Sequence, residues 1–474
     1  MNSSFFWKIE KYLLVLLYVL GLFIFIFFQK YEILIIHTFL LFTVFIGFAA
    51  SFKYNVFFGH LLSFYYLIVG PINLIIAVAN PDLLIINRLG TYYGTWIFQK
   101  NDILWSYCLR LMIFYSLTMF VMTLINKPKP LFSPLRNAAP PFININSMFA
   151  LFVIAIIVSI VEYHLRVTYY LDIPGAQPII PFAGLIVYST RILKISFLFY
   201  ILEFVISKHK TKTAIKVLLV GLIIFITHLP DILIGNRGNV FTAIALPIVY
   251  YLMLDSKRQK PKIRLFQALV LASFAIVVIG VTNVFRLGYF DTFFFILRRF
   301  TGMYDGTAVL EYFENGVKPP YNVFDYFSGF FFKNGETPNY YYTHTILGYP
   351  LEASHSNAAP LFINSWYYNG YLGVVIISIF MGFIAGLINR IYKYESKIIA
   401  FDEHNILSQY NNRLAIFCSL NAFLILMGLF IDGSSIQISS FIVPLGSYVL
   451  CRLVSFNRNI NFSRIRRLIT NEQN

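Results

Sequence analysis

Charged residues are scarce in this sequence of 474 residues, at 12% of the chain, against about 25% in ordinary soluble domains. Together with a hydrophobic fraction of 58%, this scarcity excludes a soluble globular protein. Cysteine is also rare, because the chain has only three cysteines, and Cys108, Cys418 and Cys451 all lie within apolar runs. Neither a disulfide framework nor a zinc site is therefore predicted.

Long apolar runs make up much of the sequence, and a helix that spans a bilayer needs roughly 20 apolar residues. We predict an all-α polytopic membrane protein with about 12 transmembrane helices, forming one membrane domain over residues 1–474. The first span lacks a small-residue cleavage pattern, so we expect it to stay as an anchor. The predicted spans are Tyr12–Phe28, Ile33–Ala50, Val56–Ala79, Ile103–Ile125, Ser147–Val161, Ile179–Ile206, Ile215–Leu233, Val240–Leu254, Leu265–Phe285, Gly370–Ile388, Leu414–Ile431 and Gln437–Val454.

Lys and Arg are unevenly divided between alternate connecting segments. With the N-terminus inside, 24 of the 37 lie in inside segments, 10 in outside segments and 3 within spans. Because cytoplasmic loops carry the excess of Lys and Arg, both termini are predicted to be cytoplasmic. The net charge of +16 is then explained by topology in a lipid bilayer, and no nucleic-acid partner is expected.

The longest outside segment is Arg286–Asn369, between the ninth and tenth spans. It has 84 residues, of which 24 are aromatic, and we predict that this large periplasmic loop is the catalytic region. Within it, Phe293–Asp305 is expected to form a short helix in the membrane interface. The alternative is an aromatic belt with a packed loop.

Three cations fall inside predicted spans, namely Arg110, Arg191 and Lys194. Each costs at least ~2.5 kcal/mol on insertion scales, so each needs a partner, a water-filled cavity or an anionic ligand. Arg191 and Lys194 are three residues apart and share a helix face. They are read either as part of an anion site or as partners of an intramembrane acid, Glu203 or Asp231.

Arginines also gather at the outer ends of the spans. Arg237 lies between Gly235 and Gly238 at the opening of a predicted helix, which is a suitable place for an anion; the alternative is a hairpin whose Arg reaches the lipid headgroups. Guanidinium groups bind phosphate in a bidentate manner, and His355, near the end of the large loop, has the chemistry to move a proton, unless it is only a solvated residue. Three further arginines follow the ninth span: Arg286, Arg298 and Arg299.

Two segments resemble the O-antigen polymerase and ligase superfamily. The first is Ile234-Gly235-Asn236-Arg237-Gly238-Asn239, which leads into an apolar span. The second runs from His355 through Asn357 to Gly370-Tyr371-Leu372-Gly373 and into a Gly-rich span at 381–386. The span count, the late outer loop and the cytoplasmic termini fit as well. The chain most resembles the oligosaccharide repeat unit polymerases of the Wzy type.

This resemblance implies a glycosyltransferase of the bacterial inner membrane, with its active site facing the periplasm. The growing glycan on undecaprenyl pyrophosphate would be transferred to the next lipid-linked repeat unit, in O-antigen or related surface polysaccharide synthesis. An O-antigen ligase and a lipid-linked oligosaccharide flippase are the alternatives. The expected partners are the lipid-linked repeat units, the bilayer and a chain-length regulator protein.

The resemblance also assigns roles to particular residues. His355 is the first choice of base for the acceptor hydroxyl, with Glu352 and Asp305 in reserve. Because arginines can neutralise the departing pyrophosphate, no metal and no other cofactor is expected. The arginines expected to bind the pyrophosphate are Arg191, Arg237, Arg286, Arg298 and Arg299.

Overall fold

The computed structural model is almost entirely helical over the residues that it describes, which form no β-strand. These residues are 3–54, 56–84, 95–126, 145–170, 183–207, 213–233, 242–247, 249–250, 273, 277–278, 280–281, 284, 302–314, 316–331, 338–346, 359–401, 406–432 and 441–453. The all-α prediction is therefore confirmed for this part of the chain.

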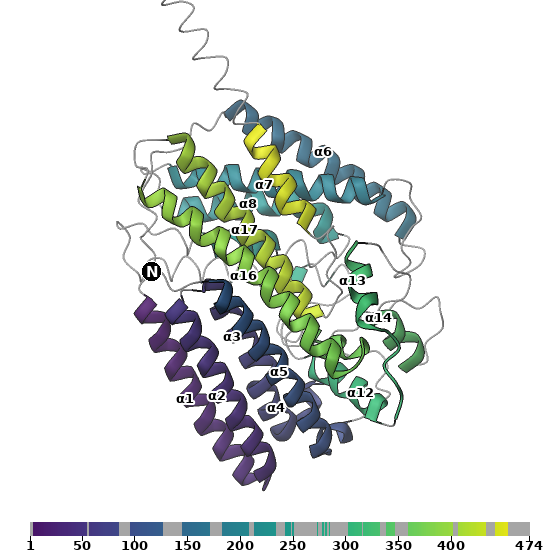
Figure 1. Ribbon diagram of the computed structural model, residues 1–474. Helices are drawn as coiled ribbons and strands as arrows, with labels where there is room; N and C mark the ends of the chain where they lie inside the picture. The colour runs from purple at the N-terminus through teal and green to yellow at the C-terminus, as the bar shows by residue number, and fades with distance from the viewer. Residues whose placement is uncertain are drawn as a thin grey trace, which may run out of the picture.

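The N-terminal part is a bundle of long helices in which α5 lies in the middle of the packing. Beside α5 lie α2 and α3, and α1 packs against α2 at the edge of the molecule (Figure 1). The elements are α1 (Ser3–Phe27), α2 (Tyr31–Tyr54), α3 (Phe57–Leu67), the π-helix η1 (Ile68–Ile72), α4 (Asn73–Ala79), and α5 (Asn101–Ile125).

The remaining long helices complete the bundle. Helix α16 packs along α5 and α17, while α6, α7 and α8 form a second group, seen at the top of Figure 1. Their bounds are α6 (Ile145–Tyr170), α7 (Ala183–Ser207), α8 (Thr213–Leu233), α16 (Tyr371–Phe401) and α17 (Ile406–Asp432), followed by a helix at 441–453.

Short helices from two predicted outside segments, Asn80–Asp102 and the large loop Arg286–Asn369, gather at one end of the bundle, at the lower right of Figure 1. Two 3₁₀ helices precede α5, and the others come from the large loop and lead into α16. They are η2 (Pro81–Leu84), η3 (Thr95–Gln99), α12 (Met303–Glu314), α13 (Val323–Phe331), α14 (Pro338–Tyr341), η4 (Tyr342–Ile346), α15 (Leu361–Asn364) and η5 (Ser365–Tyr367). We call this group the end layer.

Within the described part of the chain, six helical segments are long and apolar enough to cross a membrane. They are Glu10–Phe27, Tyr31–Tyr54, Phe58–Ala79, Asn101–Ile125, Tyr371–Ile391 and Arg413–Phe430, and shorter apolar helices cover Phe149–Leu165 and Ile442–Leu453. The outer face of α1 leaves Leu16, Phe23 and Phe27 largely exposed, which is the surface expected against lipid tails. The chain is thus a helical protein of membrane type, and the total of twelve spans stays a prediction.

Two predicted spans differ in detail from the helices observed. The run Val56–Ala79 is interrupted at η1, because Pro71 has no backbone N–H to donate and its ring opens the preceding turn. Helix α6 runs from Ile145 to Tyr170 and so extends past the predicted span Ser147–Val161. Polar residues such as Glu162 end an apolar run without ending a helix.

Close packing of α5 on α16 depends on glycines. A Cβ on Gly382 would lie 2.7 Å from the carbonyl oxygen of Thr118, and one on Gly386 would lie 2.9 Å from the Ile125 side chain. The hydroxyl of Thr118 also donates to the Ser378 carbonyl across the interface, at 3.2 Å. The Gly-rich span is therefore explained here by the close approach of two helices.

Candidate functional site

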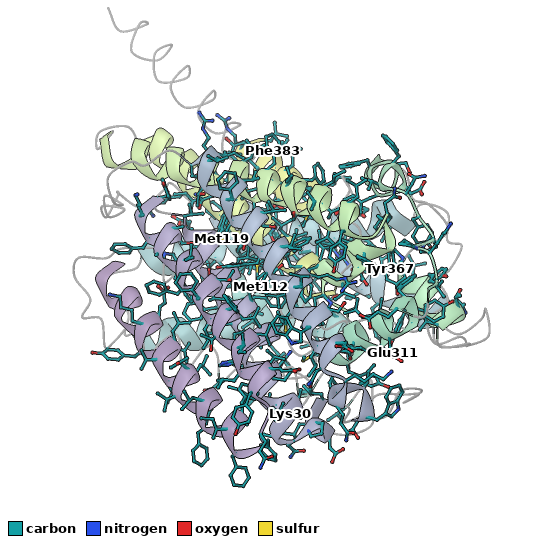
Figure 2. All side chains as sticks on the ribbon, turned by 60° about the horizontal axis from the view of Figure 1, so that its bottom comes forward. Lys30, Met112, Met119, Glu311, Tyr367 and Phe383 are labelled. Atoms are coloured by element: carbon teal, nitrogen blue, oxygen red, sulfur yellow. The ribbon has the colours of Figure 1, made fainter. Side chains whose placement is uncertain are left out.

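The end layer is anchored to the bundle by an ion pair and by close packing. Lys100, just before α5, lies 2.5 Å from a carboxylate oxygen of Glu311 in α12. A Cβ on Gly306 would approach the Tyr107 ring of α5 to 2.9 Å. Figure 2 shows Glu311 and Tyr367 toward one side of the molecule, with Met112 of α5 nearer the middle of the view. The two predicted outside segments therefore meet at the same end of the bundle.

The start of α16 is bound to the end layer through the backbone. Tyr321 donates its N–H to the carbonyl of Tyr367 at 3.1 Å and accepts the N–H of Asn369 at 3.0 Å. Asn369 and Gly370 both have positive φ, at 60° and 63°. A Cβ on Gly373 would overlap the Tyr368 carbonyl oxygen, at 1.8 Å. These glycines of the family-like motif thus have a structural role in a tight turn.

A buried carboxylate lies among tyrosines within the end layer. Asp305 in α12 is 1% exposed, and the hydroxyl of Tyr342 donates to its Oδ1 at 2.9 Å. Tyr367 is fully buried, and its hydroxyl has no hydrogen-bond partner within the described part of the chain. Burial raises the pKa of Tyr367 well above its usual value, and the nearby groups Tyr321, Tyr341 and Asp305 raise it further. The Tyr367 hydroxyl therefore keeps its proton at neutral pH.

Half-buried tyrosines line the same cluster. The ring of Tyr341 lies 5.7 Å from that of Tyr367 and 6.2 Å from that of Tyr321. Burial, and next a hydrogen bond with Tyr312, raise the pKa of Tyr341 to about 12. The cluster therefore combines one buried carboxylate, neutral hydroxyl groups and flat apolar rings, which can accept hydroxyl protons, donate hydrogen bonds and stack on a sugar ring. We call it the Asp305 cluster.

A buried cation lies where α5 meets the start of α16. The guanidinium carbon of Arg110 is 3.9 Å from the centre of the Trp366 ring and 5.0 Å from that of Tyr371. Its Nη1 donates to the carbonyl of Ser106 at 2.9 Å and also contacts the Ser106 hydroxyl. The sequence shows Arg110 as a cation that is expensive to insert into a membrane, but it predicts no role for this residue. Its aromatic partners could not be found from the sequence, because they are about 260 residues away in the chain.

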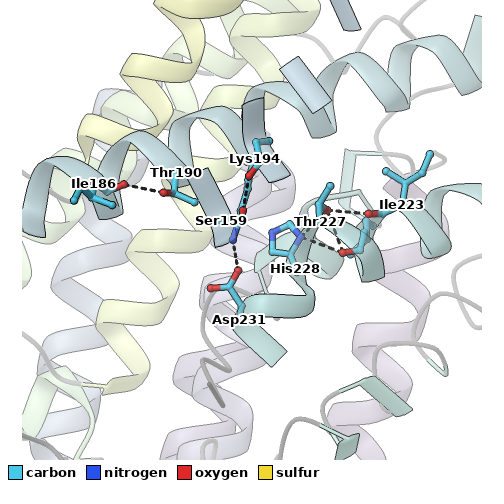
Figure 3. Close-up of polar contacts among 10 residues, drawn as sticks. Ser159, Ile186, Thr190, Lys194, Ile223, Thr227, His228 and Asp231 are labelled. Atoms are coloured by element: carbon cyan, nitrogen blue, oxygen red, sulfur yellow. Dashed lines mark hydrogen bonds and ion pairs between the residues drawn. The ribbon is translucent and has the colours of Figure 1, made fainter. Parts of the chain in front are cut away.

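Lys194 forms an ion pair with one of the two acids considered from the sequence. Its Nζ is 2.5 Å from Oδ2 of Asp231, and the two side chains are 3% and 1% exposed. Figure 3 shows Lys194 on α7 reaching Asp231 on α8, with His228 beside the pair. The Nδ1 of His228 lies within hydrogen-bond distance of Thr227, at 3.0 Å. The ion-pair reading of Lys194 is therefore correct.

The second intramembrane acid has a different partner. Glu203 in α7 accepts a hydrogen bond from Arg413 of α17 at 2.9 Å and another from the hydroxyl of Tyr250 at 2.5 Å. Helix α7 thus carries a cation and an anion that bind two different helices. Both arrangements satisfy buried charges, and neither forms an open site among the described residues.

Of the site residues predicted from the sequence, the structure describes Asp305 and Arg191. Asp305 lies in the end layer, and Arg191 is half-buried in α7, on the helix that carries Lys194. The expected interfacial helix 293–305 is described only from residue 302, and Met303–Asp305 form the first turn of α12. Six predicted site residues lie outside the described residues: Arg237, Arg286, Arg298, Arg299, Glu352 and His355.

Sequence reasoning also missed the tyrosines around Asp305. Tyr342 and Tyr367 come from η4 and η5, which are 37 or more residues away from the carboxylate. Their only signal in the sequence is the aromatic enrichment of the loop. Among the described residues, no group of three or more His, Cys, Asp or Glu side chains is arranged to hold a metal ion.

Comparison with known proteins adds no identification, because no protein-family model, no curated protein and no solved structure matches the chain. The fold and the site define the class of the protein. It is a helical protein of membrane type, with an aromatic end layer that encloses a carboxylate.

Proposed function

We propose that the protein is a polymerase of lipid-linked oligosaccharide repeat units in a bacterial inner membrane. It transfers the growing glycan from undecaprenyl pyrophosphate to the next lipid-linked repeat unit on the periplasmic face. The observation that carries the proposal is the Asp305 cluster, in which a buried carboxylate and tyrosine rings occupy the end layer beside the start of α16. The resemblance of the segments at 234–239 and 355–373 to repeat unit polymerases supports it.

The chemistry required fits the residue types available. Attack by an acceptor hydroxyl needs a base, and His355 is proposed for this role, with Glu352 and Asp305 in reserve. Charge develops on the departing pyrophosphate, and preorganised cations stabilise such charge in a site from which water is excluded. Arg191, Arg237, Arg286, Arg298 and Arg299 are proposed to supply those cations, so no metal is needed in this mechanism.

The first experiment asks which reaction the cell loses. A strain lacking the protein is examined by gel electrophoresis of its surface glycans. A polymerase predicts a lipid core that carries one repeat unit. Polymer that stays on the lipid carrier would instead indicate a ligase, and the absence of any repeat outside would indicate a flippase. Unchanged surface glycans would refute all three functions.

The second experiment separates the candidate bases. His355→Ala is expected to lower the polymerisation rate by about a hundredfold or more, which is the typical contribution of a general base. His344→Ala is the matched control, because His344 lies in the same loop in η4. Both variants are assayed on lipid-linked repeats at equal protein level. Full activity of His355→Ala would move the base role to Glu352 or Asp305.

Asp305 offers a test inside the described structure. Asp305→Asn keeps the size of the side chain and removes its charge and basicity. Asp325→Asn is the control, because Asp325 lies in the same loop and its side chain accepts the local N–H of Asn322 at 2.7 Å. If Asp305 takes part in the reaction, Asp305→Asn lowers activity far more than Asp325→Asn does. Equal activities would exclude Asp305 from the site.

A further inference from the structure

Arg110 differs from the other buried cations that the structure describes. Lys194 and Arg413 each have a carboxylate within 2.9 Å. Arg110 is only 3% exposed, yet none of the carboxylates in the described residues forms an ion pair with it. Its Nε also has no hydrogen-bond partner there. The exposed Glu314 of α12 attracts Arg110 without forming an ion pair with it. A buried cation with no paired carboxylate is expensive, so an anion bound at the guanidinium would stabilise the arrangement.

A second donor without a partner lies beside the guanidinium. The indole Nε1–H of Trp366 is buried and has no hydrogen-bond acceptor among the residues described, although the ring itself is in contact with Arg110. Two N–H donors on neighbouring side chains, one of them permanently charged, match an anion with several acceptor oxygens. The planar fork of a guanidinium suits phosphate in particular.

The surroundings place this donor pair at a lipid-facing boundary. The ring centre of Tyr371 lies 5.0 Å from the guanidinium carbon of Arg110, and Tyr371 is 42% exposed. Trp366 and Tyr371 belong to the residue types that are enriched at the headgroup level of a bilayer. The site therefore borders the surface at Tyr371, at the level where lipid phosphates lie.

We propose that Arg110 and the Trp366 indole bind the phosphate group of a membrane lipid. Two sources share this chemistry, namely an anionic phospholipid headgroup and the diphosphate of a polyprenyl carrier. The site does not depend on the proposed polymerase function, because a phospholipid would fill it equally in a protein of another activity.

The test is native mass spectrometry of the full-length protein in detergent with three probes added separately. The probes are phosphatidylglycerol, undecaprenyl diphosphate and uncharged diacylglycerol. We expect either phosphate lipid, or both, to bind and diacylglycerol not to bind. Retention of phosphatidylglycerol alone identifies a phospholipid site, and retention of undecaprenyl diphosphate alone identifies a carrier site. Equal retention of diacylglycerol would overturn the proposal.

Variants assign the binding to these side chains. Arg110→Gln is expected to weaken retention of the phosphate lipid by about tenfold or more, and Trp366→Phe, which keeps an aromatic ring but removes the N–H, by roughly threefold to tenfold. Arg452→Gln is the matched control, because Arg452 also lies over a tyrosine ring, Tyr448, at 5.6 Å but is exposed. The Arg452→Gln variant should retain the phosphate lipid as the wild type does.

The outcome is read together with a folding check by size-exclusion chromatography. Folded Arg110→Gln with unchanged retention of every probe would overturn the proposal, as would an equal loss in Arg452→Gln. If Arg110→Gln fails to fold, Trp366→Phe decides, and wild-type retention in that variant contradicts the site. Glycan polymerisation is measured separately, so failure of the proposed function leaves this result intact.

Discussion

Two lysine–carboxylate pairs have the same length and very different burial, which makes them a natural comparison. Lys194–Asp231 and Lys100–Glu311 both measure 2.5 Å between nitrogen and oxygen. The side chains of the first pair are 3% and 1% exposed, whereas those of the second are 46% and 12% exposed. Any difference between the effects of breaking the two pairs therefore reports on burial rather than on geometry.

The expected magnitudes follow from electrostatics. At 2.5 Å, and with an effective dielectric constant of about 20, the Coulomb attraction is ~7 kcal/mol, most of which is offset by the cost of desolvating two ions. Removing one partner of a buried pair leaves the other charge uncompensated and costs about 3–5 kcal/mol. An exposed pair contributes only about 0.2–1 kcal/mol.

Asp231→Asn and Glu311→Gln test this difference by equilibrium unfolding in mixed micelles. We expect Asp231→Asn to lower the free energy of unfolding by several times as much as Glu311→Gln does. The double variant Lys194→Met with Asp231→Leu should recover most of the loss, because it removes both charges and fills the space. Similar losses from the two single variants, or no recovery in the double variant, would refute this reasoning.

Further predictions concern packing, topology and metal dependence. Gly382→Leu should destabilise the protein by about 1–3 kcal/mol through overlap with α5, whereas Gly428→Ala, where a Cβ meets nothing within 4 Å, should be tolerated; thermal unfolding compares them. Reporter fusions at Gly329 and Asn411 should report the periplasm and the cytoplasm respectively, and the opposite pair would reverse the orientation. Under the proposed polymerase function, a chelator should leave the purified protein active on lipid-linked repeats; activity that is lost and then restored by a divalent ion would contradict the proposed arginine mechanism.

The long helices were largely predictable from the sequence, because an apolar run has to be helical to satisfy its backbone in lipid. The predicted span Ile103–Ile125 and the observed α5 differ by two residues at the start. The interruption at η1 has a visible signal in Pro71, but a π-helical turn depends on how the neighbouring helices pack. The far end of α6 was missed because hydropathy falls there while helical hydrogen bonding continues.

The contacts of the site were much less predictable. The sequence restricted the partner of Lys194 to Asp231 or Glu203, and only the packing of α7 on α8 decides between them. Asp305 was named as a reserve base, whereas the tyrosine that donates to it, Tyr342, could not be singled out among 33 tyrosines. Arg110 is easily recognised in the sequence as a cation within an apolar run. Its aromatic neighbours cannot be predicted in the same way, because they come from a segment far away in the chain and depend on the tertiary packing.

The pairing of Glu203 with Arg413 has a consequence for the order in which the protein is synthesised and assembled. The two residues are 210 positions apart, so at a synthesis rate of about 5–20 residues per second the carboxylate precedes its partner by roughly 10–40 seconds. Of the two observed partners of Glu203, only the Tyr250 hydroxyl, 47 positions away, is available during that interval. Assembly of this helix group therefore finishes only when α17 arrives, and a ribosome stalled before residue 413 would leave α7 exposed to the quality-control proteases of the membrane.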